Sequence, residues 1–190
     1  QAITTPIFTA LDSNQNFRDL AGIAATYGGT GFADATSTGG WMRTGVFYRA
    51  EALSTGSLNA ADLATVTSLR IGLDVDLRTD SEIAGPANPP MAPNAGPDQA
   101  IGATWVHANI YGTPNPVPPD LSSVPAASTF IITTYQNFVA DPTQHAGIRT
   151  ALLALASAEG AALYHCSGGK DRTGWVSMLL QTIAGVPSAS

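Results

Sequence analysis

The chain has 190 residues, of which 44% are hydrophobic, and it contains a single cysteine. This length suits one domain with a sizeable apolar core, and one cysteine excludes an internal disulfide. Eight basic and 14 acidic side chains give a formal net charge of -6, which argues against a broad basic surface for nucleic acid or for an anionic membrane. Any anionic ligand must therefore be bound at a focused site.

Two features of the sequence bear on where the protein works. The chain starts at Gln1 and not at a methionine, and only 12% of its residues are charged. Together they predict a mature secreted or periplasmic protein whose signal peptide has been removed; the alternative is a chain trimmed for expression. No apolar run approaches the roughly 20 residues that a membrane-spanning helix needs, so we expect no integral membrane segment.

Apolar periodicity predicts alternating strands and helices along the chain. The predicted strands cover residues 46–50, 73–77, 104–110 and 161–165. The predicted helices carry apolar stripes at Leu63, Val66 and Leu69; at Ile131, Tyr135 and Phe138; at Ile148, Leu152 and Leu155; and, over residues 172–184, at Trp175, Leu179 and Ile183 with Val176 and Leu180 beside them. Strands separated by helices predict an α/β fold, a central and mostly parallel sheet flanked by helices, as one domain over residues 1–190.

Three segments carry more specific expectations. The strand over 73–77 alternates Leu, Val and Leu with Asp74 and Asp76, which predicts one apolar face. The helix over 172–184 is apolar on most sides and is expected to be buried. Two proline-rich stretches, 85–97 and 112–125, predict surface loops that could serve as walls or lids over a site or as simple connections.

The only cysteine and the only lysine lie together in the stretch HCSGGKDRTG, residues 165–174. The last predicted strand leads into Cys166, and the last predicted helix begins near Arg172, so the intervening loop closes on a helix N-terminus. There the free amides and the helix dipole favour a phosphate dianion. Gly168 and Gly169 allow the backbone to turn its amides toward one point. The stretch predicts a phosphate-binding catalytic loop.

Each polar side chain of this loop suits one part of phosphoryl transfer. The helix terminus should lower the pKa of Cys166, which makes its thiolate the nucleophile. Arg172 offers a planar fork for two phosphoryl oxygens, and Thr173 can donate a hydrogen bond to the thiolate. Asp171 could protonate the leaving oxygen and then activate water. Lys170 adds a flexible positive charge at the rim, and His165 is expected to orient the loop.

Together these residues resemble the signature of the cysteine-dependent protein tyrosine phosphatases, and most closely the bacterial branch that also handles phosphoinositides. Three further blocks resemble that branch and stand in its order: NFRDLAG at 16–22, VFYRAEAL at 46–53 and VDLRTDSE at 75–82. The first block has Ala21 where the branch has glycine. The blocks span most of the chain.

The resemblance implies a phosphatase fold in which Cys166 is the nucleophile, Arg172 binds phosphate and Asp171 is a general acid inside the loop. Asp76 and Asp80 compete for the acid role, because they follow a strand at the edge where α/β sites lie. The other role open to both is an ion pair with Arg49 or Arg78, and this role is favoured for Asp76.

The candidate site has a catalytic set and a substrate-binding set. The catalytic set is Cys166, Arg172, Asp171 and Thr173, and the substrate-binding set is Ser167, Gly168, Gly169, Lys170, Arg49 and Asp76. Arg18 and Asp19 are expected to be structural. We expect no metal and no cofactor. Because the family continues with further helices beyond the loop helix, we also expect C-terminal helices to be missing from this sequence.

The leading hypothesis is a metal-independent phosphomonoesterase that works through a phosphocysteine, with phosphorylated protein or phosphoinositide as substrate. Because the chain has few basic residues, we expect a tyrosine or dual-specificity phosphatase. The alternative is a phosphoinositide or inositol phosphate phosphatase, and Lys170 favours it. A phosphate-binding module without turnover is a second class. A redox or sulfur-transfer enzyme lacks a resolving cysteine here, and a cysteine protease would need a separate histidine base.

Overall fold

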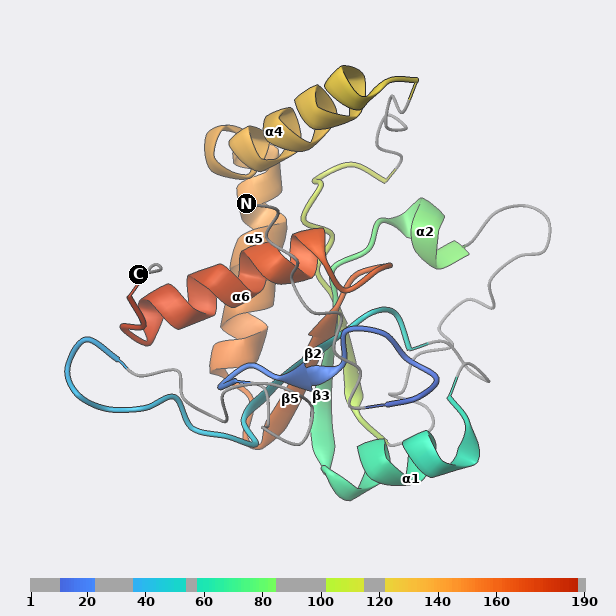
Figure 1. Cartoon of the computed structure of the whole chain (residues 1–190), viewed down its shortest axis with the longest axis vertical. Coiled ribbons are helices and arrows are strands. Elements are labelled where there is room, and N and C mark those ends of the chain that lie inside the picture. Colours follow the sequence, from blue (N-terminus) through green and yellow to red (C-terminus); the bar gives the residue numbers. More distant parts are fainter. Residues whose placement is uncertain (1–10, 23–35, 54–57, 85–101, 115–121, 188–190) are drawn as a thin grey trace.

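The structure is a computed structural model, and it describes residues 11–22, 36–53, 58–84, 102–114 and 122–187. In chain order its elements are β1 (Arg18–Asp19), β2 (Phe47–Ala50), α1 (Ala60–Ser68), β3 (Ile71–Asp76), α2 (Asp80–Ala84), β4 (Thr104–His107), α4 (Val124–Ala140), α5 (Pro142–Ala156), β5 (Ala161–His165) and α6 (Asp171–Ile183) (Figure 1). Strands and helices alternate as predicted.

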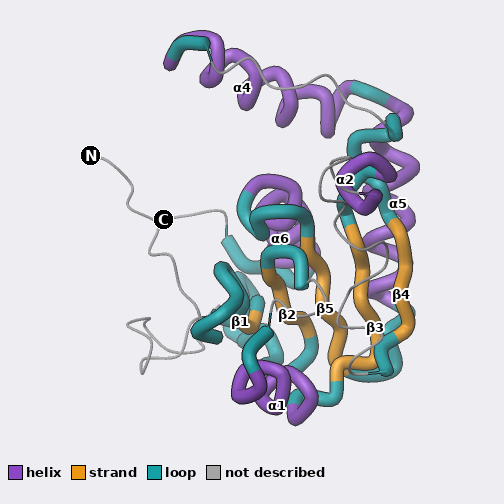
Figure 2. The backbone as a smooth tube through the Cα atoms, turned by 90° about the vertical axis from the view of Figure 1, so that its right-hand side faces the viewer, coloured by secondary structure: helices purple, strands orange, loops and turns teal. Residues whose placement is uncertain are grey.

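The strands form one sheet in the order β1-β2-β5-β3-β4 (Figure 2). Only β1 pairs antiparallel, with β2, and the other three pairings are parallel. The register places Ala50 and Asp76 opposite His165, and His107 opposite Asp76. The carboxyl ends of the four parallel strands are therefore level. The predicted α/β fold around a mostly parallel sheet is confirmed, and its level edge is where such folds bind ligands.

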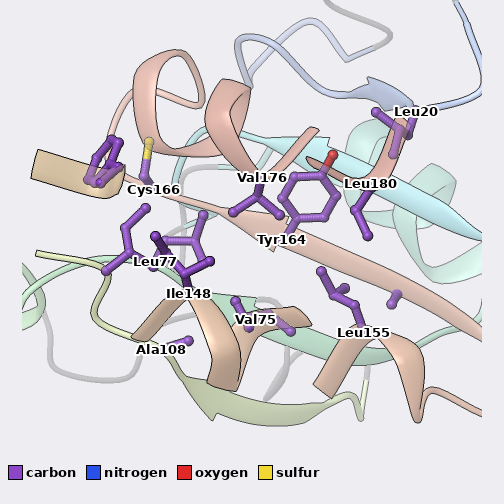
Figure 3. Close-up of a cluster of buried hydrophobic side chains, with 14 residues drawn as sticks. Leu20, Val75, Leu77, Ala108, Ile148, Leu155, Tyr164, Cys166, Val176 and Leu180 are labelled. Carbon is purple, nitrogen blue, oxygen red and sulfur yellow. The ribbon is translucent and has the colours of Figure 1, made fainter. Parts of the chain in front are cut away.

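Helices cover both faces of the sheet. In Figure 1, α5 and α6 lie on one side of the strands and α1 lies on the other. The larger core lies under α5 and α6, with Val75, Tyr164 and Val176 fully buried in it (Figure 3). The smaller core joins α1 to the other face and contains Val66, Leu163 and, from the segment before β1, Phe17. Alternate residues of β5, Leu163 and Tyr164, thus face different cores.

The polar face of β3 is buried as completely as its apolar face. Val75 and Leu77 lie in the larger core, as the alternation predicts. Asp74 and Asp76, on the opposite face, are also 0% exposed. Because a strand in the middle of this parallel sheet is covered on both sides, its carboxylates must be satisfied inside the protein.

The last helix is buried along a different stripe from the predicted one. Val176 and Leu180 are buried, whereas Ile183 is 72% exposed and Trp175 and Leu179 are only partly buried. The reason is that the Val176 and Leu180 side faces the sheet. The neighbouring stripe, with Trp175 and Leu179, lines a groove of about 550 Å³ between α4, α5 and α6.

The apolar stripe predicted for α4 does not form a buried face. Phe138 is the only buried residue among its 17, and Ile131 and Ile132 are exposed. Figure 2 shows α4 extending away from the sheet. Apolar spacing alone does not show which face of a helix packs against another element of the fold.

One of the two predicted loops and one predicted strand end elsewhere, and the other loop is not described. Residues 85–97 lie outside the described residues, as do 115–121 of the second stretch. The end of that stretch is helical, because Ser123 caps α4 and Pro125 fits in its first turn. The strand predicted over 104–110 stops at His107, where the Asn109 side chain accepts the amide of Tyr111 and turns the chain.

Within the ranges that the structure describes, no helix is both long enough and apolar enough to cross a lipid bilayer.

Candidate active site

The loop from Cys166 to Lys170 connects the end of β5 to the start of α6. Asp171 begins the helix, and Lys170 precedes it without a side-chain cap. The free amides of the first helical turn therefore face the loop. Cys166 is buried at one end of the larger core, and its sulfur points away from Leu77 (Figure 3). The strand–loop–helix arrangement predicted for the motif is present.

Donors from the N-terminal third of the chain hold the loop from outside. They bind three consecutive carbonyls: Ser167 O accepts from Ala52 N at 3.1 Å, Gly168 O from Asn16 Nδ2 at 3.0 Å, and Gly169 O from Arg49 Nη2 at 2.8 Å. With its carbonyls drawn outward, the backbone turns amides inward, and the Gly169 amide hydrogen-bonds the Cys166 sulfur. A concave set of N–H groups of this kind binds anions.

The two loop glycines are not equivalent. Gly169 has φ +63°, and a Cβ built there would lie 2.4 Å from the carbonyl carbon and oxygen of Ala50 and from the amide of Glu51. No residue with a side chain can occupy this position without moving β2. Gly168 is exposed, and a Cβ there would meet nothing within 4 Å. The predicted need for glycine is therefore specific to Gly169.

Several groups converge on the sulfur of Cys166. Burial by itself raises the pKa of this thiol, but the Arg172 guanidinium, the Thr173 hydroxyl and the amides of Thr173 and Gly169 together lower it below its usual value. The Thr173 hydroxyl is fully buried, and among the described residues it makes no hydrogen bond to a nitrogen or oxygen atom. The site favours a thiolate, as the sequence predicted.

The Arg172 guanidinium is held by a carboxylate that the sequence analysis did not single out. Glu82, on α2, accepts Nη1 at 2.6 Å and Nη2 at 2.5 Å. It also accepts the Ser167 hydroxyl at 2.7 Å. Burial raises the pKa of Glu82, but Arg172 outweighs it and brings the pKa to about 2. The ring of Tyr111 lies 4.8 Å from the guanidinium carbon on another side. Arg172 is thus oriented before any ligand binds.

One local signal could have identified Glu82. Thr79 and Glu82 form a capping box at the start of α2: the Glu82 carboxylate accepts the Thr79 amide at 2.9 Å, and the Thr79 hydroxyl accepts the Glu82 amide at 3.3 Å. The Thr-x-x-Glu spacing is visible in the sequence. Its partnership with Arg172, 90 residues later, is not.

Asp171 and Lys170 lie at the mouth of the loop. Asp171 is partly exposed, and its Oδ1 accepts the hydroxyl of Tyr135, on α4, at 3.4 Å. Lys170 is exposed. The roles predicted for them, an acid beside the loop and a positive charge at its rim, stay predictions.

Arg49 is directed at the loop backbone. Its Nη1 binds the Ser177 hydroxyl and its Nη2 binds Gly169 O, both at 2.8 Å. Direct substrate binding by Arg49 stays a prediction, and the contacts seen here show how it shapes the loop.

Asp76 forms the ion pair with Arg78 that the sequence analysis allowed, at 2.7 Å. Burial raises the pKa of Asp76, but His165 and Arg78 outweigh it and bring the pKa to about 2. The carboxylate is 0% exposed, so this geometry does not favour it as a substrate contact or an acid. Asp80, the other competitor, is mostly exposed and lies 3.6 Å from His107.

His165 lies beneath the loop between two buried carboxylates. Its Nε2 is 3.4 Å from Asp74, and its Nδ1 is 3.9 Å from Asp76 and 3.3 Å from the Cys166 carbonyl oxygen. Burial lowers the pKa of His165, but Asp74 and Asp76 outweigh it and raise the pKa to about 9. The imidazolium fixes the residue before the nucleophile, which is the orienting role predicted for it.

In the N-terminal block, Asp19 holds the turn into β2 by accepting the amides of Ala21 at 2.9 Å and Gly45 at 2.7 Å. Arg18 binds the carbonyl of Asn16 at 3.1 Å. Both residues are structural, as expected. Among the described residues, no three His, Cys, Asp or Glu side chains are grouped so as to hold a metal ion.

Known proteins with similar sequences point in one direction. The sequence model of the tyrosine phosphatase family matches residues 9–190. Over 34 residues the chain is 56% identical to a tyrosine-protein phosphatase of Nostoc commune, covering 18% of this chain and 12% of that protein. Over 184 residues it is 29% identical to a protein of Cupriavidus necator provisionally named a tyrosine-protein phosphatase, covering 93% of this chain and 58% of that protein. The chain thus spans little more than half of the second relative's length.

Proposed function

Because the chain belongs to the tyrosine phosphatase family, we propose that it hydrolyses phosphomonoesters through a phosphocysteine intermediate. One observation carries the proposal: the Arg172 guanidinium, the Thr173 hydroxyl and two backbone amides all converge on the buried sulfur of Cys166 and lower its pKa. Such a site combines a thiolate nucleophile with donors for phosphoryl oxygens.

In the first half-reaction, Sγ of Cys166 attacks phosphorus. The S–P bond forms as the P–O ester bond breaks, and the Asp171 carboxyl gives its proton to the leaving oxygen. Arg172 keeps its pair with Glu82 while its longer contacts, 3.4 Å to Leu77 O and 3.4 Å to Ser167 Oγ, give way to phosphoryl oxygens. A guanidinium already oriented by Glu82 needs little rearrangement.

In the second half-reaction, water attacks the phosphocysteine. The Asp171 carboxylate takes a proton from the water, the S–P bond breaks and its electron pair returns to Sγ. The Thr173 hydroxyl stabilises the departing thiolate. The products are inorganic phosphate and the resting enzyme, so no further reactant is required.

We propose a phosphotyrosine or dual-specificity protein substrate first, because the net charge of -6 provides little attraction for highly anionic lipids. The alternative is a phosphoinositide or inositol phosphate, and the observation that favours it is exposed Lys170 at the rim of the loop. A cradle that binds phosphate without turnover is the remaining outcome.

The test is phosphate release from a phosphotyrosine peptide, a phosphoserine peptide and a phosphoinositide, with Cys166→Ser as the blank. We expect release that depends on Cys166 and is fastest with phosphotyrosine. If phosphate release is fastest from the phosphoinositide, the proposed phosphotyrosine substrate is wrong and the phosphoinositide class takes its place. If the protein binds vanadate but releases no phosphate from any substrate, it is a phosphate-binding module without turnover. If Cys166→Ser releases phosphate as fast as the wild type, the covalent mechanism is excluded.

A secreted or periplasmic location is also proposed, on the low content of charged residues alone. Fractionation of a cell that makes the native protein would test it, and recovery in the cytosol would exclude it.

A further inference from the structure

Four aromatic residues attach α4 to the rest of the fold next to the catalytic loop. We call Tyr111, Tyr135, Phe138 and Trp175 the aromatic cluster. Two of them come from α4, one from α6 and one from the segment after β4. Phe138 lies at the centre, with its ring 5.5–6.0 Å from each of the others. The rest of α4 is largely exposed except where it contacts α5, so this cluster fixes how the helix lies next to the loop.

The same cluster contacts both charged residues at the start of α6. The Tyr111 ring lies against the Arg172 guanidinium, and the Tyr135 hydroxyl donates to Oδ1 of Asp171 at 3.4 Å. The Tyr135 ring stands edge-on to Phe138, at an interplanar angle of 85°, and is tilted 46° to Trp175. Packing on two sides restricts the ring, and it therefore restricts where the hydroxyl can point.

The Tyr135 hydroxyl stays protonated across the neutral range. Burial and the nearby carboxylate of Asp171 raise the pKa of Tyr135 to about 12. A hydroxyl that keeps its proton beside a carboxylate acts as a steady donor. The 3.4 Å separation is long for a bond of this kind, and bonds to catalytic groups often shorten only in the substrate complex.

We propose that Tyr135 is a positioning residue for Asp171, and this inference rests on the proposed function. By donating to Oδ1, the hydroxyl holds the carboxyl group in one orientation and leaves Oδ2 to carry the proton to the leaving oxygen. Tyr135 itself touches no reacting atom. The consequence is that α4, which reaches the start of α6 through the aromatic cluster, contributes to acid catalysis through one hydroxyl.

The test compares Tyr135→Phe with the wild type on two aryl phosphates, one with a poor leaving group (phenyl phosphate) and one with a good leaving group (2,4-dinitrophenyl phosphate). General acids typically contribute 10²–10⁴-fold, so a misoriented acid should cost part of that. We expect kcat/KM, which reports the first half-reaction alone, to fall roughly 5–20-fold for the poor leaving group and less than about 2-fold for the good one. The second half-reaction is common to both substrates, so it cannot produce this difference.

Two controls separate positioning from packing. Tyr111→Phe removes a hydroxyl from the same cluster and should change both rates by the same factor. In an Asp171→Asn background, Tyr135→Phe should have no further leaving-group effect. An equal change in both rates, or no change, in Tyr135→Phe would overturn the inference. If the wild type shows no Cys166-dependent release at all, the proposed function fails instead, before Tyr135 is tested.

Discussion

The catalytic loop and α4 are neighbours, but they are held in different ways. Three consecutive carbonyls of the loop accept hydrogen bonds from distant segments, and its arginine is locked by Glu82. Helix α4 buries one residue, Phe138, and meets the loop through a single 3.4 Å hydrogen bond. The loop is thus held by hydrogen bonds to distant segments, whereas α4 is held by aromatic contacts near the loop and by its contact with α5. Under the proposed function, the groups that would bind phosphate are therefore fixed by polar contacts, and Tyr135 is fixed by packing.

The largest effect is expected where the loop touches β2. In Gly169→Ala, the new methyl would overlap Ala50 and Glu51, and the positive φ would add about 1–2 kcal/mol of strain. We expect a loss of roughly 4 kcal/mol of stability or more, and at least about a 100-fold loss of turnover. Thermal unfolding and phosphate release measure the two losses.

Gly168→Ala is the matched control, because its methyl would enter open space. Its unfolding free energy should stay within about 0.5 kcal/mol of the wild type. If the two variants are equally stable, the close contact with β2 does not specify the loop.

The next effect tests how α4 is attached. Phe138→Ala removes its one buried side chain and should cost about 3–5 kcal/mol if α4 unfolds with the rest of the domain. Ile132→Ala, at an exposed position on the same helix, should cost less than about 0.5 kcal/mol. Chemical denaturation of both variants makes the comparison. Similar losses would show that α4 is anchored along its length.

A smaller effect should appear as pH dependence in the charge network beneath the loop. His165 has a pKa of about 9 in the fold and about 6.5 when unfolded. Its stabilisation is therefore complete below about pH 6.5 and is lost as pH rises through 9, by roughly 1–3 kcal/mol. Thermal unfolding should be followed in the Cys166→Ser background, which removes the titration of the thiol.

The Tm of that protein should fall between pH 7 and 9.5, and adding His165→Asn should abolish most of the fall. A Tm that is level across this range would show that His165 is neutral in the fold.

The smallest effect concerns one of the external donors. Asn16→Ala removes the hydrogen bond to Gly168 O and should cost about 1 kcal/mol of stability. Because the loop keeps its other two donors, we expect kcat/KM to fall only a few-fold. Steady-state kinetics would check this, and a complete loss of activity would mean that the three donors act as one unit.

Sequence reasoning succeeded where the partners are close along the chain. The strand before Cys166 and the helix after Lys170 both follow from the pattern around one stretch of ten residues, whereas the roles of Thr173 and Arg172 stay predictions. Fold class followed from the alternation of strand and helix patterns. Such local patterns are set by backbone geometry, which the sequence carries directly.

Sequence reasoning failed where a side chain's partner is distant along the chain, and where burial depends on which elements cover it. The pairing of Glu82 with Arg172 depends on how β3 and β5 are placed in the sheet. The apolar spacing of α4 was visible, but not the fact that only Phe138 meets a partner. The burial of Asp74 depends on cover over the second face of the sheet, which alternation cannot report.

The external donors also make the order of folding matter. Asn16 is 152 residues from Gly168, and Arg49 is 120 residues from Gly169. Contacts between residues so far apart form slowly, because closing a long stretch of chain costs conformational entropy before the contacts can stabilise the fold. During synthesis the N-terminal donors leave the ribosome long before the loop exists. A nascent chain would therefore acquire this loop geometry only after β5 has inserted between β2 and β3.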